Sequence, residues 1–379
     1  MLIAIDGSEA FVKNKTGVES YAYQIILNLA KIDRRNRYIV YLDPRLNTLG
    51  DVGKWPENFI FKALKWPILW TQLGLALQTF IDPIDLLFSP SHTTPLLHRP
   101  GLKTVVTVHD LGVEFLPLTH QFKQALYLKW ISRVQLKLAT KLIAVSKATK
   151  KDLMTKIGIN GGKIAVIYEA LVPLERNEVD TKVNGLRQFE LEKERYFLFI
   201  GTIQPRKNLV RLIQAFAQFL KTGPVSAQPC LQSPVLALAG SRGWSADQIY
   251  RLPEELGIED KVRFLGRLES RDLAVLYSNA LAFVYPSLFE GFGLPILEAF
   301  NFDCPVITSN VSSMPEVSGQ AALLVDPYSE EEICRAMVKL SKDHKLRREL
   351  VEKGREQLKK FSWDKAARQT LSVFEEVCR

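Results

Sequence analysis

Short apolar runs rich in β-branched and aromatic residues alternate with longer amphipathic segments through most of the chain. The first half contains seven predicted strands, at residues 2–5, 38–42, 59–63, 86–88, 104–108, 142–145 and 164–167. The second half contains six more, at residues 196–200, 235–239, 262–265, 281–285, 305–307 and 322–325. Strands that are apolar on both faces and separated by helices favour a parallel, doubly wound sheet.

The intervening segments show helical periodicity, at residues 18–31, 122–139, 208–220, 271–278, 294–301 and 330–341 and near the C-terminus. Residues 169–194 are polar, charge-rich and without a clear period, which is typical of a linker. The fold class predicted is α/β, with two Rossmann-like domains, 1–175 and 190–361, and a final helix within 362–379 that crosses back to the first. Ligands bind at the carboxyl ends of strands in such sheets, so we expect the two domains to face each other across a cleft.

The composition is that of a folded globular protein, because 47% of the 379 residues are hydrophobic and 24% are charged. No run of about 18 apolar residues occurs, so no membrane-spanning helix is predicted. The N-terminal residues MLIAIDGSEA lack the basic region of a signal peptide, and we expect a cytoplasmic location. The cysteines show no C-x-x-C spacing, which favours reduced thiols over a disulfide or metal framework.

The net charge of +9 is unevenly distributed. Between Gln121 and Asn160 there are nine Lys or Arg residues against one acid, Asp152. This basic stretch, 123–156, could rest on an anionic membrane at the inner face of the plasma membrane, with Trp55, Trp66 and Trp70 as an interfacial region. Alternatively, the lysines form the solvated face of a helix and the tryptophans belong to the core.

The segment SLFEGFGLPILEA, residues 287–299, follows a predicted strand and enters a helix. Gly291 and Gly293 allow the backbone to approach a ligand, and Pro295 suits a first helical turn. The N–H groups at such a helix start favour an anion. With Glu290 and Glu298 on either side, the pattern suits a sugar phosphate or nucleotide; the alternative is a plain strand–loop–helix with surface glutamates.

A second strand-to-helix segment reads FIGTIQPRKN, residues 199–208. Gly201 opens the loop, Arg206 and Lys207 lie at the expected helix start, and Asn208 is a possible cap. Two cations there oppose the helix dipole unless an anion lies between them. Arg and Lys both bind phosphate oxygens, so the pair is interpreted as a diphosphate clamp, with a solvated surface pair as the alternative.

The first half offers two further candidates. His109 and Asp110 end the predicted strand 104–108, where side chains face a cleft, and Gly17 lies in a loop that could approach a phosphate. The chain contains no G-x-G-x-x-G fingerprint and no phosphate-binding G-x-x-x-x-G-K-[ST] loop, which disfavours a dehydrogenase. It also contains no Asp-x-Asp, so we expect no metal cofactor.

These pieces, in this order, resemble glycosyltransferase family 4 over nearly the whole chain. Glu290 and Glu298, with seven residues between them, are similar to the two-glutamate motif of that family. The segments 306–316 and 321–327 resemble a branch rich in mannosyltransferases, and FSWD at 361–364 resembles the start of its crossover helix. The resemblance implies a GT-B fold and a retaining, metal-independent hexosyltransferase in cell-surface polysaccharide or glycolipid synthesis. GDP-mannose is the first expected donor and UDP sugars come next; a saccharide or lipid-linked saccharide is the expected acceptor.

The resemblance also implies roles for individual residues. Glu298 would bind the ribose hydroxyls and Glu290 the sugar hydroxyls of the donor. Arg206 and Lys207 would bind the diphosphate, and His109 would lie beside the primary hydroxyl of the sugar and the reacting centre.

The remaining expected donor contacts come from loops. Gly17 would approach the diphosphate from the first domain, Gly201 would belong to the donor site, and Arg267 and Leu268 would lie near the base. The backbone would meet the sugar and diphosphate at Phe292, Gly293 and Leu294. Many members of the family carry an Arg where this chain has Thr202, so Arg206 departs from the family pattern.

Two other classes of protein remain as alternatives. A non-hydrolysing sugar-nucleotide epimerase would share the two domains and the nucleotide-sugar site. A basic nucleic-acid-binding protein would explain the charge, but it would not need the Glu290 and Glu298 pair, and no basic-aromatic stacking platform is evident. We therefore expect no nucleic-acid partner.

Overall fold

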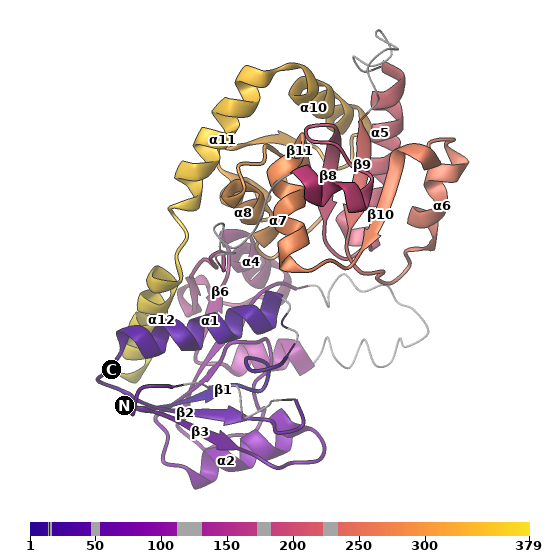
Figure 1. The fold of residues 1–379 in the computed structure, drawn as a ribbon. Helices are drawn as coiled ribbons and strands as arrows, with labels where there is room; N and C mark the ends of the chain where they lie inside the picture. The colour runs from indigo at the N-terminus through magenta and orange to yellow at the C-terminus, as the bar shows by residue number, and fades with distance from the viewer. Residues whose placement is uncertain (14, 16, 47–53, 112–130, 173–182, 223–233) are drawn as a thin grey trace. The chain divides into compact units, whose positions relative to one another are not determined.

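The computed structural model describes residues 1–379 except 14, 16, 47–53, 112–130, 173–182 and 223–233 (Figure 1). The chain forms two compact units. The first comprises Met1–Ala170 together with Phe361–Arg379, and the second comprises Leu171–Lys360. The C-terminal helix α12 (Trp363–Cys378) therefore belongs to the first unit, where it packs against α1 (Gly17–Ile32).

The first unit is built on a parallel sheet of seven strands in the order β3-β2-β1-β4-β5-β6-β7. The order reverses between β1 and β4, which is the arrangement of a Rossmann-like sheet. The strands are β1 (Leu2–Asp6), β2 (Arg37–Leu42), β3 (Phe59–Ala63), β4 (Leu86–Ser89), β5 (Lys103–Val108), β6 (Lys141–Ala144) and β7 (Ile164–Val166).

The second unit has a parallel sheet of six strands in the order β10-β9-β8-β11-β12-β13. Its reversal lies between β8 and β11. The strands are β8 (Tyr196–Ile200), β9 (Val235–Ala239), β10 (Val262–Gly266), β11 (Ala282–Tyr285), β12 (Val306–Ser309) and β13 (Ala322–Val325). All thirteen strands of the described residues lie within two residues of the predicted bounds, and the two parallel sheets confirm the predicted fold class.

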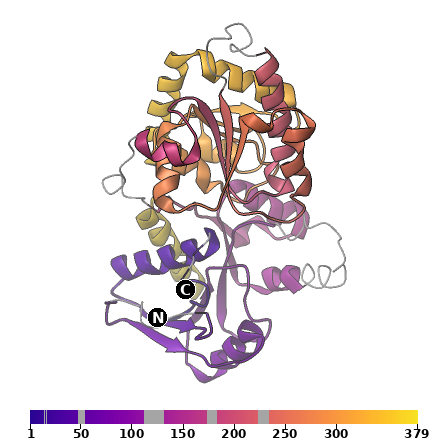
Figure 2. The same ribbon diagram turned by 45° about the vertical axis from the view of Figure 1, so that its right-hand side comes forward.

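Helices connect these strands (Figure 2). In the first unit they also include η2 (Trp70–Leu75), a π-helix that continues into α2 (Ala76–Ile81), and α4 (Lys147–Asp152), η4 (Leu153–Ile157) and η5 (Gly161–Lys163). The second unit contains η7 (Val183–Phe189), η8 (Pro205–Lys207), α5 (Leu209–Thr222), α6 (Asp247–Glu255), η9 (Glu259–Lys261), α7 (Ser270–Asn279), α8 (Leu294–Asn301), α9 (Met314–Ser318), α10 (Glu330–Lys342) and α11 (His344–Leu358).

Side-chain caps fix where several helices begin. The hydroxyl of Ser329 accepts from the Glu332 amide at the start of α10, and the Asp343 carboxylate accepts from the Leu346 amide at the start of α11. Ser362 does the same for Lys365 in α12. Such caps satisfy amides that have no partner inside a helix.

The three tryptophans discussed above pack into the first unit. Trp70 is buried and its indole N–H donates to Leu64 O at 3.0 Å, while Trp66 packs against the same core cluster. Trp55 contacts aromatic rings of Phe11 and Phe61. These contacts favour the core alternative for the three tryptophans, and contact of the first unit with a membrane stays a prediction. Of the basic stretch, residues 123–130 lie outside the described residues, and 131–138 are helical.

Candidate active site

The candidate residues of the second unit gather where the strand order of its sheet reverses. β8 and β11 are neighbours, so the loops that leave their carboxyl ends lie next to each other. The loop after β8 carries Gly201, Arg206 and Lys207, and the loop after β11 carries Glu290 and Gly293. Ligands of open α/β sheets bind at this position.

Glu290 pairs with both predicted phosphate-binding cations. Arg206 Nη1 donates to Glu290 Oε2 at 3.0 Å and also to Phe289 O at 2.9 Å. Lys207 Nζ donates to Glu290 Oε1 at 2.6 Å and to Tyr285 Oη at 2.6 Å. Glu290 and Lys207 are each only 7% exposed, so two cations and one carboxylate form a buried cluster with an excess of positive charge.

The cluster keeps its carboxylate ionised. Burial alone would raise the pKa of Glu290, but the charges of Lys207 and Arg206 and the hydrogen bond from Lys207 hold that pKa below its ordinary value. Burial and the neighbouring Glu290 charge raise the pKa of Tyr285 well above its usual value, so its hydroxyl stays protonated.

A short 3₁₀ turn, η8, presents the two cations. Asn208 follows it in the left-handed conformation, with φ of 62°. The Asn208 side-chain amide donates to Pro286 O at 3.1 Å and to Pro327 O at 2.6 Å. It thus ties the loop after β8 to the loop after β11, a role that differs from the helix cap considered from the sequence.

The turn before α8 has the geometry that the glycine pattern predicts. Gly293 immediately precedes the helix and has φ of 109°, a backbone conformation that residues other than glycine rarely adopt. The Ser313 hydroxyl donates to Phe292 O at 2.6 Å and to Glu290 O at 3.0 Å. Ser312 also donates to Glu290 O, at 2.6 Å. These two serines, which the sequence analysis did not assign, hold the loop that carries Glu290.

Glu298 lies inside α8 and has a partner of its own. Its Oε2 accepts from the Tyr277 hydroxyl of α7 at 2.9 Å. Burial raises the pKa of Glu298 above its ordinary value, and the hydrogen bond from Tyr277 opposes this shift. Leu294, at the first position of the same helix, is half-buried, whereas Phe292 is buried.

Gly201 follows β8, and Arg267 and Leu268 follow β10, with β9 between these two strands in the sheet. Gly201 N donates to Ala239 O at 2.9 Å, and Gly240 N donates to Gly266 O at 2.7 Å, so the loops after β8, β9 and β10 are linked. Arg267 is exposed and Leu268 half-buried after the edge strand β10. A Cβ on Gly240 would meet Gly201 O at 1.9 Å, so this close approach requires glycine there.

In the first unit, His109 ends β5 and is buried. Its Nδ1 donates to Glu169 Oε1 at 2.7 Å, and its Nε2 donates to Pro90 O at 2.9 Å. The Tyr21 ring packs edge-on at 4.6 Å between ring centroids. Both ring nitrogens face acceptors, an arrangement that needs two N–H groups and therefore the charged imidazolium.

The neighbours of His109 explain its charge. Burial alone would lower its pKa, but the hydrogen bond and the charge of Glu169 raise it above the ordinary value. Burial and the charge of His109 lower the pKa of the nearby His92 to about 4. The surroundings thus favour the charged form of His109 and the neutral form of His92. Gly17, which opens α1, is exposed and does not contact this pair in the described structure.

Glu169 is the residue that sequence reasoning placed wrongly. It was assigned to the start of the linker, but it is only 5% exposed. Its position shortly after an apolar strand, in the segment IAVIYE, could have indicated burial. A buried acid needs a hydrogen-bonding or charged partner. Among the residues that the structure describes, no group of three or more His, Cys, Asp or Glu could hold a metal ion.

Comparison with known proteins adds two family matches. Residues 15–171 match the model of "Glycosyltransferase Family 4", and residues 186–357 match that of "Glycosyl transferases group 1". The O-antigen chain mannosyltransferase B of Escherichia coli is 32% identical over 274 residues, which is 72% of this chain and 70% of that protein. The O-antigen chain mannosyltransferase RfbU of Salmonella typhimurium is 29% identical, over 71% and 69% of the two chains.

Solved structures show the same fold. Sucrose-phosphate synthase from Thermosynechococcus elongatus superposes with a TM-score of 0.74 at 20% identity, over 99% of this chain and 98% of that one. HepE from Anabaena, solved in complex with UDP and glucose, gives a TM-score of 0.70 at 17% identity, over 99% of both chains.

Proposed function

This chain belongs to the glycosyltransferases of family 4, and from that premise we propose that it is a retaining mannosyltransferase. It would move mannose from GDP-mannose to a hydroxyl of a saccharide or lipid-linked saccharide in cell-surface polysaccharide or glycolipid synthesis. The similarity to two O-antigen mannosyltransferases supports this choice of sugar and acceptor. The matches do not support the epimerase or the nucleic-acid-binding alternative.

The observation that carries the proposal is the buried cluster of Arg206, Lys207 and Glu290 beside the turn at Gly293. In the proposal, the diphosphate binds at Arg206, Lys207 and the N-terminal amides of α8, which supply positive charge without a metal ion. Glu290, freed in part from its cations by the diphosphate, would then accept hydrogen bonds from sugar hydroxyls. Glu298 would accept from the ribose.

The reaction would proceed on one face of the sugar. The bond from C1 to the phosphate oxygen breaks, and its electron pair leaves with the diphosphate. The acceptor oxygen bonds to C1 from the same face, and its proton passes to the departing phosphate oxygen. The share of the protein is electrostatic, because fixed cations stabilise the charge that develops on the diphosphate. We assign His109 to the region of the sugar's primary hydroxyl.

Transfer assays with matched variants test the proposal. GDP-mannose and UDP-glucose are compared as donors, in buffer with and without EDTA, and the anomeric configuration of the product is read by NMR. We expect transfer from GDP-mannose, unaffected by EDTA, with retention. Glu290→Gln should abolish most of it, whereas Glu349→Gln, at an exposed position, should not. Transfer from UDP-glucose alone would contradict the donor, and inversion would contradict the mechanism.

A cytoplasmic location and peripheral contact with an anionic membrane stay predictions. None of the helices among the described residues is long and apolar enough to cross a membrane. A lipid-linked acceptor would favour membrane contact, because the reacting hydroxyl would then lie close to the lipid surface.

A further inference from the structure

Residues 66–81 form an uncharged segment in a chain that is 24% charged. The sequence WPILWTQLGLALQTFI is bounded by Lys65 and Asp82 and contains no charged residue. It is too short to span a bilayer as a helix, because spanning needs about 20 residues. A segment of this composition is expected inside a core, so the position of its side chains is informative.

Six large apolar side chains of this segment are exposed to solvent. Two of them, at 68 and 69, come just before the η2–α2 helix, and four, at 73, 77, 80 and 81, have a spacing that places them along one side of it. Their exposed fractions range from 48% to 68%, and Leu97 is 76% exposed. We call this set the apolar ridge; it comprises Ile68, Leu69, Leu73, Leu77, Phe80, Ile81 and Leu97.

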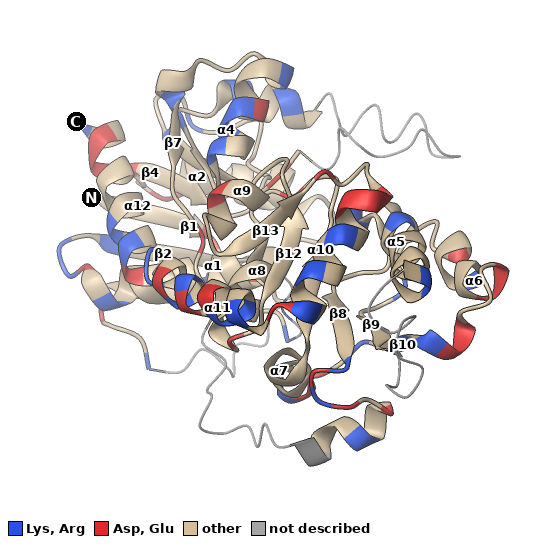
Figure 3. Cartoon of the chain, turned by 90° about the horizontal axis from the view of Figure 1, so that it is seen from above, with Lys and Arg blue, Asp and Glu red and all other residues tan. Residues whose placement is uncertain are grey.

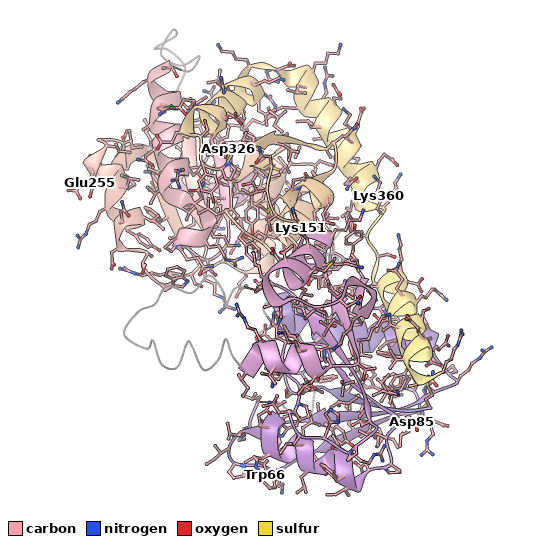
Figure 4. The ribbon with its side chains drawn as sticks, turned by 180° about the vertical axis from the view of Figure 1, so that it is seen from behind. Trp66, Asp85, Lys151, Glu255, Asp326 and Lys360 are labelled. Atoms are coloured by element: carbon pink, nitrogen blue, oxygen red, sulfur yellow. The ribbon has the colours of Figure 1, made fainter. Side chains whose placement is uncertain are left out.

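The opposite side of the helix is packed against the rest of the first unit. A Cβ on Gly74 would lie 2.9 Å from Trp66 Cβ, so the helix packs directly on that tryptophan (Figure 4). Gln78 is buried and donates to Asp82 Oδ2 at 2.7 Å, and Thr79 is buried and donates to Ala76 O at 2.7 Å. Gln78 and Thr79 are therefore buried together with Leu75, whereas the exposed side of the helix is apolar, unlike that of an ordinary surface helix.

Hydrogen bonds attach the loop that carries Leu97 to this helix. Gln72 donates to Thr94 O at 3.1 Å and accepts from Leu96 N at 3.0 Å. Thr94 O also accepts from Gln135 at 2.6 Å, and Gln135 lies in the helical residues 131–138. The ridge and the described end of the basic stretch therefore meet at one loop.

The net positive charge of the chain comes entirely from the first unit, which carries the ridge. The first unit has 25 Lys and Arg against 16 Asp and Glu, a net charge of +9, whereas the second has 25 against 25. Lys65 at the start of the ridge is exposed, as are Arg133 and Lys137 on the helical residues 131–138. Asp82, which follows the last residue of the ridge helix, pairs with Lys62 at 2.9 Å.

From these observations we propose that the apolar ridge docks on an anionic lipid bilayer, with the η2–α2 helix lying in the plane of the interface. Its aliphatic side chains would enter the headgroup region while basic side chains of the same unit attract the lipid charge. A second copy of the chain is the other candidate occupant. It fits less well, because two units of net charge +9 repel each other whereas an anionic surface attracts one.

Vesicle sedimentation tests this surface without any sugar substrate, so its failure is distinguishable from failure of the proposed transferase activity. The full chain is mixed with vesicles of phosphatidylcholine alone, or of phosphatidylcholine with phosphatidylglycerol. We expect binding to the anionic vesicles that weakens at high salt. The double variant Leu73→Gln/Leu77→Gln should reduce that binding by roughly tenfold or more, since two leucines no longer enter the lipid.

The matched control is Leu256→Gln/Leu324→Gln, which changes two exposed leucines of the second unit and should bind like the parent. Leu69→Gln/Phe80→Gln provides a second ridge variant if the first does not fold, as judged by thermal melting. Equal binding by parent and ridge variants would overturn the proposal. So would a parent dimer that the ridge variant converts to a monomer while vesicle binding persists, because the ridge would then be an interface between copies.

Discussion

Replacing Lys207 by methionine should both destabilise the second unit and impair catalysis. Methionine keeps much of the side-chain volume but removes an ammonium group that lies 2.6 Å from both Glu290 Oε1 and Tyr285 Oη. Removing one partner of a buried ion pair costs about 3–5 kcal/mol, because the other charge remains buried. Arg206 stays 3.0 Å from Glu290 Oε2, so we expect the lower end, about 3 kcal/mol.

The catalytic effect has a separate cause. If Lys207 stabilises the departing diphosphate, its loss removes one preorganised donor, which is worth about 2–4 kcal/mol in the transition state. That corresponds to a decrease in kcat of roughly 30- to 900-fold. The variant must be assayed below its own melting temperature, where it is folded, so that unfolding does not contribute to the decrease.

A double variant separates the two effects. Lys207→Met/Glu290→Gln also removes the carboxylate that loses its lysine partner in the single variant. The double variant should therefore recover much of the lost stability, as measured by thermal melting. Its kcat should stay as low as that of the single variant or fall further. If Lys207→Met melts like the parent, the ion pairs of the cluster do not stabilise the fold. If the double variant regains kcat, Lys207 does not take part in catalysis. Either result refutes the reasoning.

Three further predictions concern stability. Because the pKa of His109 is raised in the folded protein, its contribution is full below the ordinary histidine pKa of about 6.5 and is lost as the pH rises through the folded value. Melting curves across this range should show that loss for the parent and much less for Glu169→Gln. Gly240→Ala, with its Cβ against Gly201 O, should cost at least about 2 kcal/mol in chemical unfolding. Asp303→Asn removes an exposed ion pair and should leave the melting temperature nearly unchanged.

The strands could be predicted from sequence because each is a short run rich in apolar residues, and most are buried. The helices were predicted less completely. α11 was not predicted, since it carries basic and acidic residues over most of its surface and buries little (Figure 3). α6 was also missed, because Pro253 interrupts its pattern although it lies inside the helix. Such helices depend on tertiary contacts: Gly354 of α11 packs against Phe300 of α8 so closely that a Cβ would lie 2.8 Å away.

The site was predictable in part, because a strand followed by glycines and charged residues marks a loop at a carboxyl end. What the local pattern does not contain is the strand order. Arg206 and Glu290 are 84 residues apart, and only the pairing of β8 with β11 brings them together. The roles expected from sequence likewise assigned separate partners to the carboxylate and the two cations, whereas in the structure they pair with each other.

The charge on His109 has a consequence for its chemistry. A histidine that already carries protons on both nitrogens cannot remove a proton from the acceptor hydroxyl, but it can donate a hydrogen bond. Glu169 holds Nδ1, so the nitrogen available to a sugar oxygen is Nε2, which would release Pro90 O to make that bond. If His109 lies beside the sugar as proposed, the proton of the acceptor would therefore go to another group, which in the proposed one-face reaction is the departing phosphate oxygen.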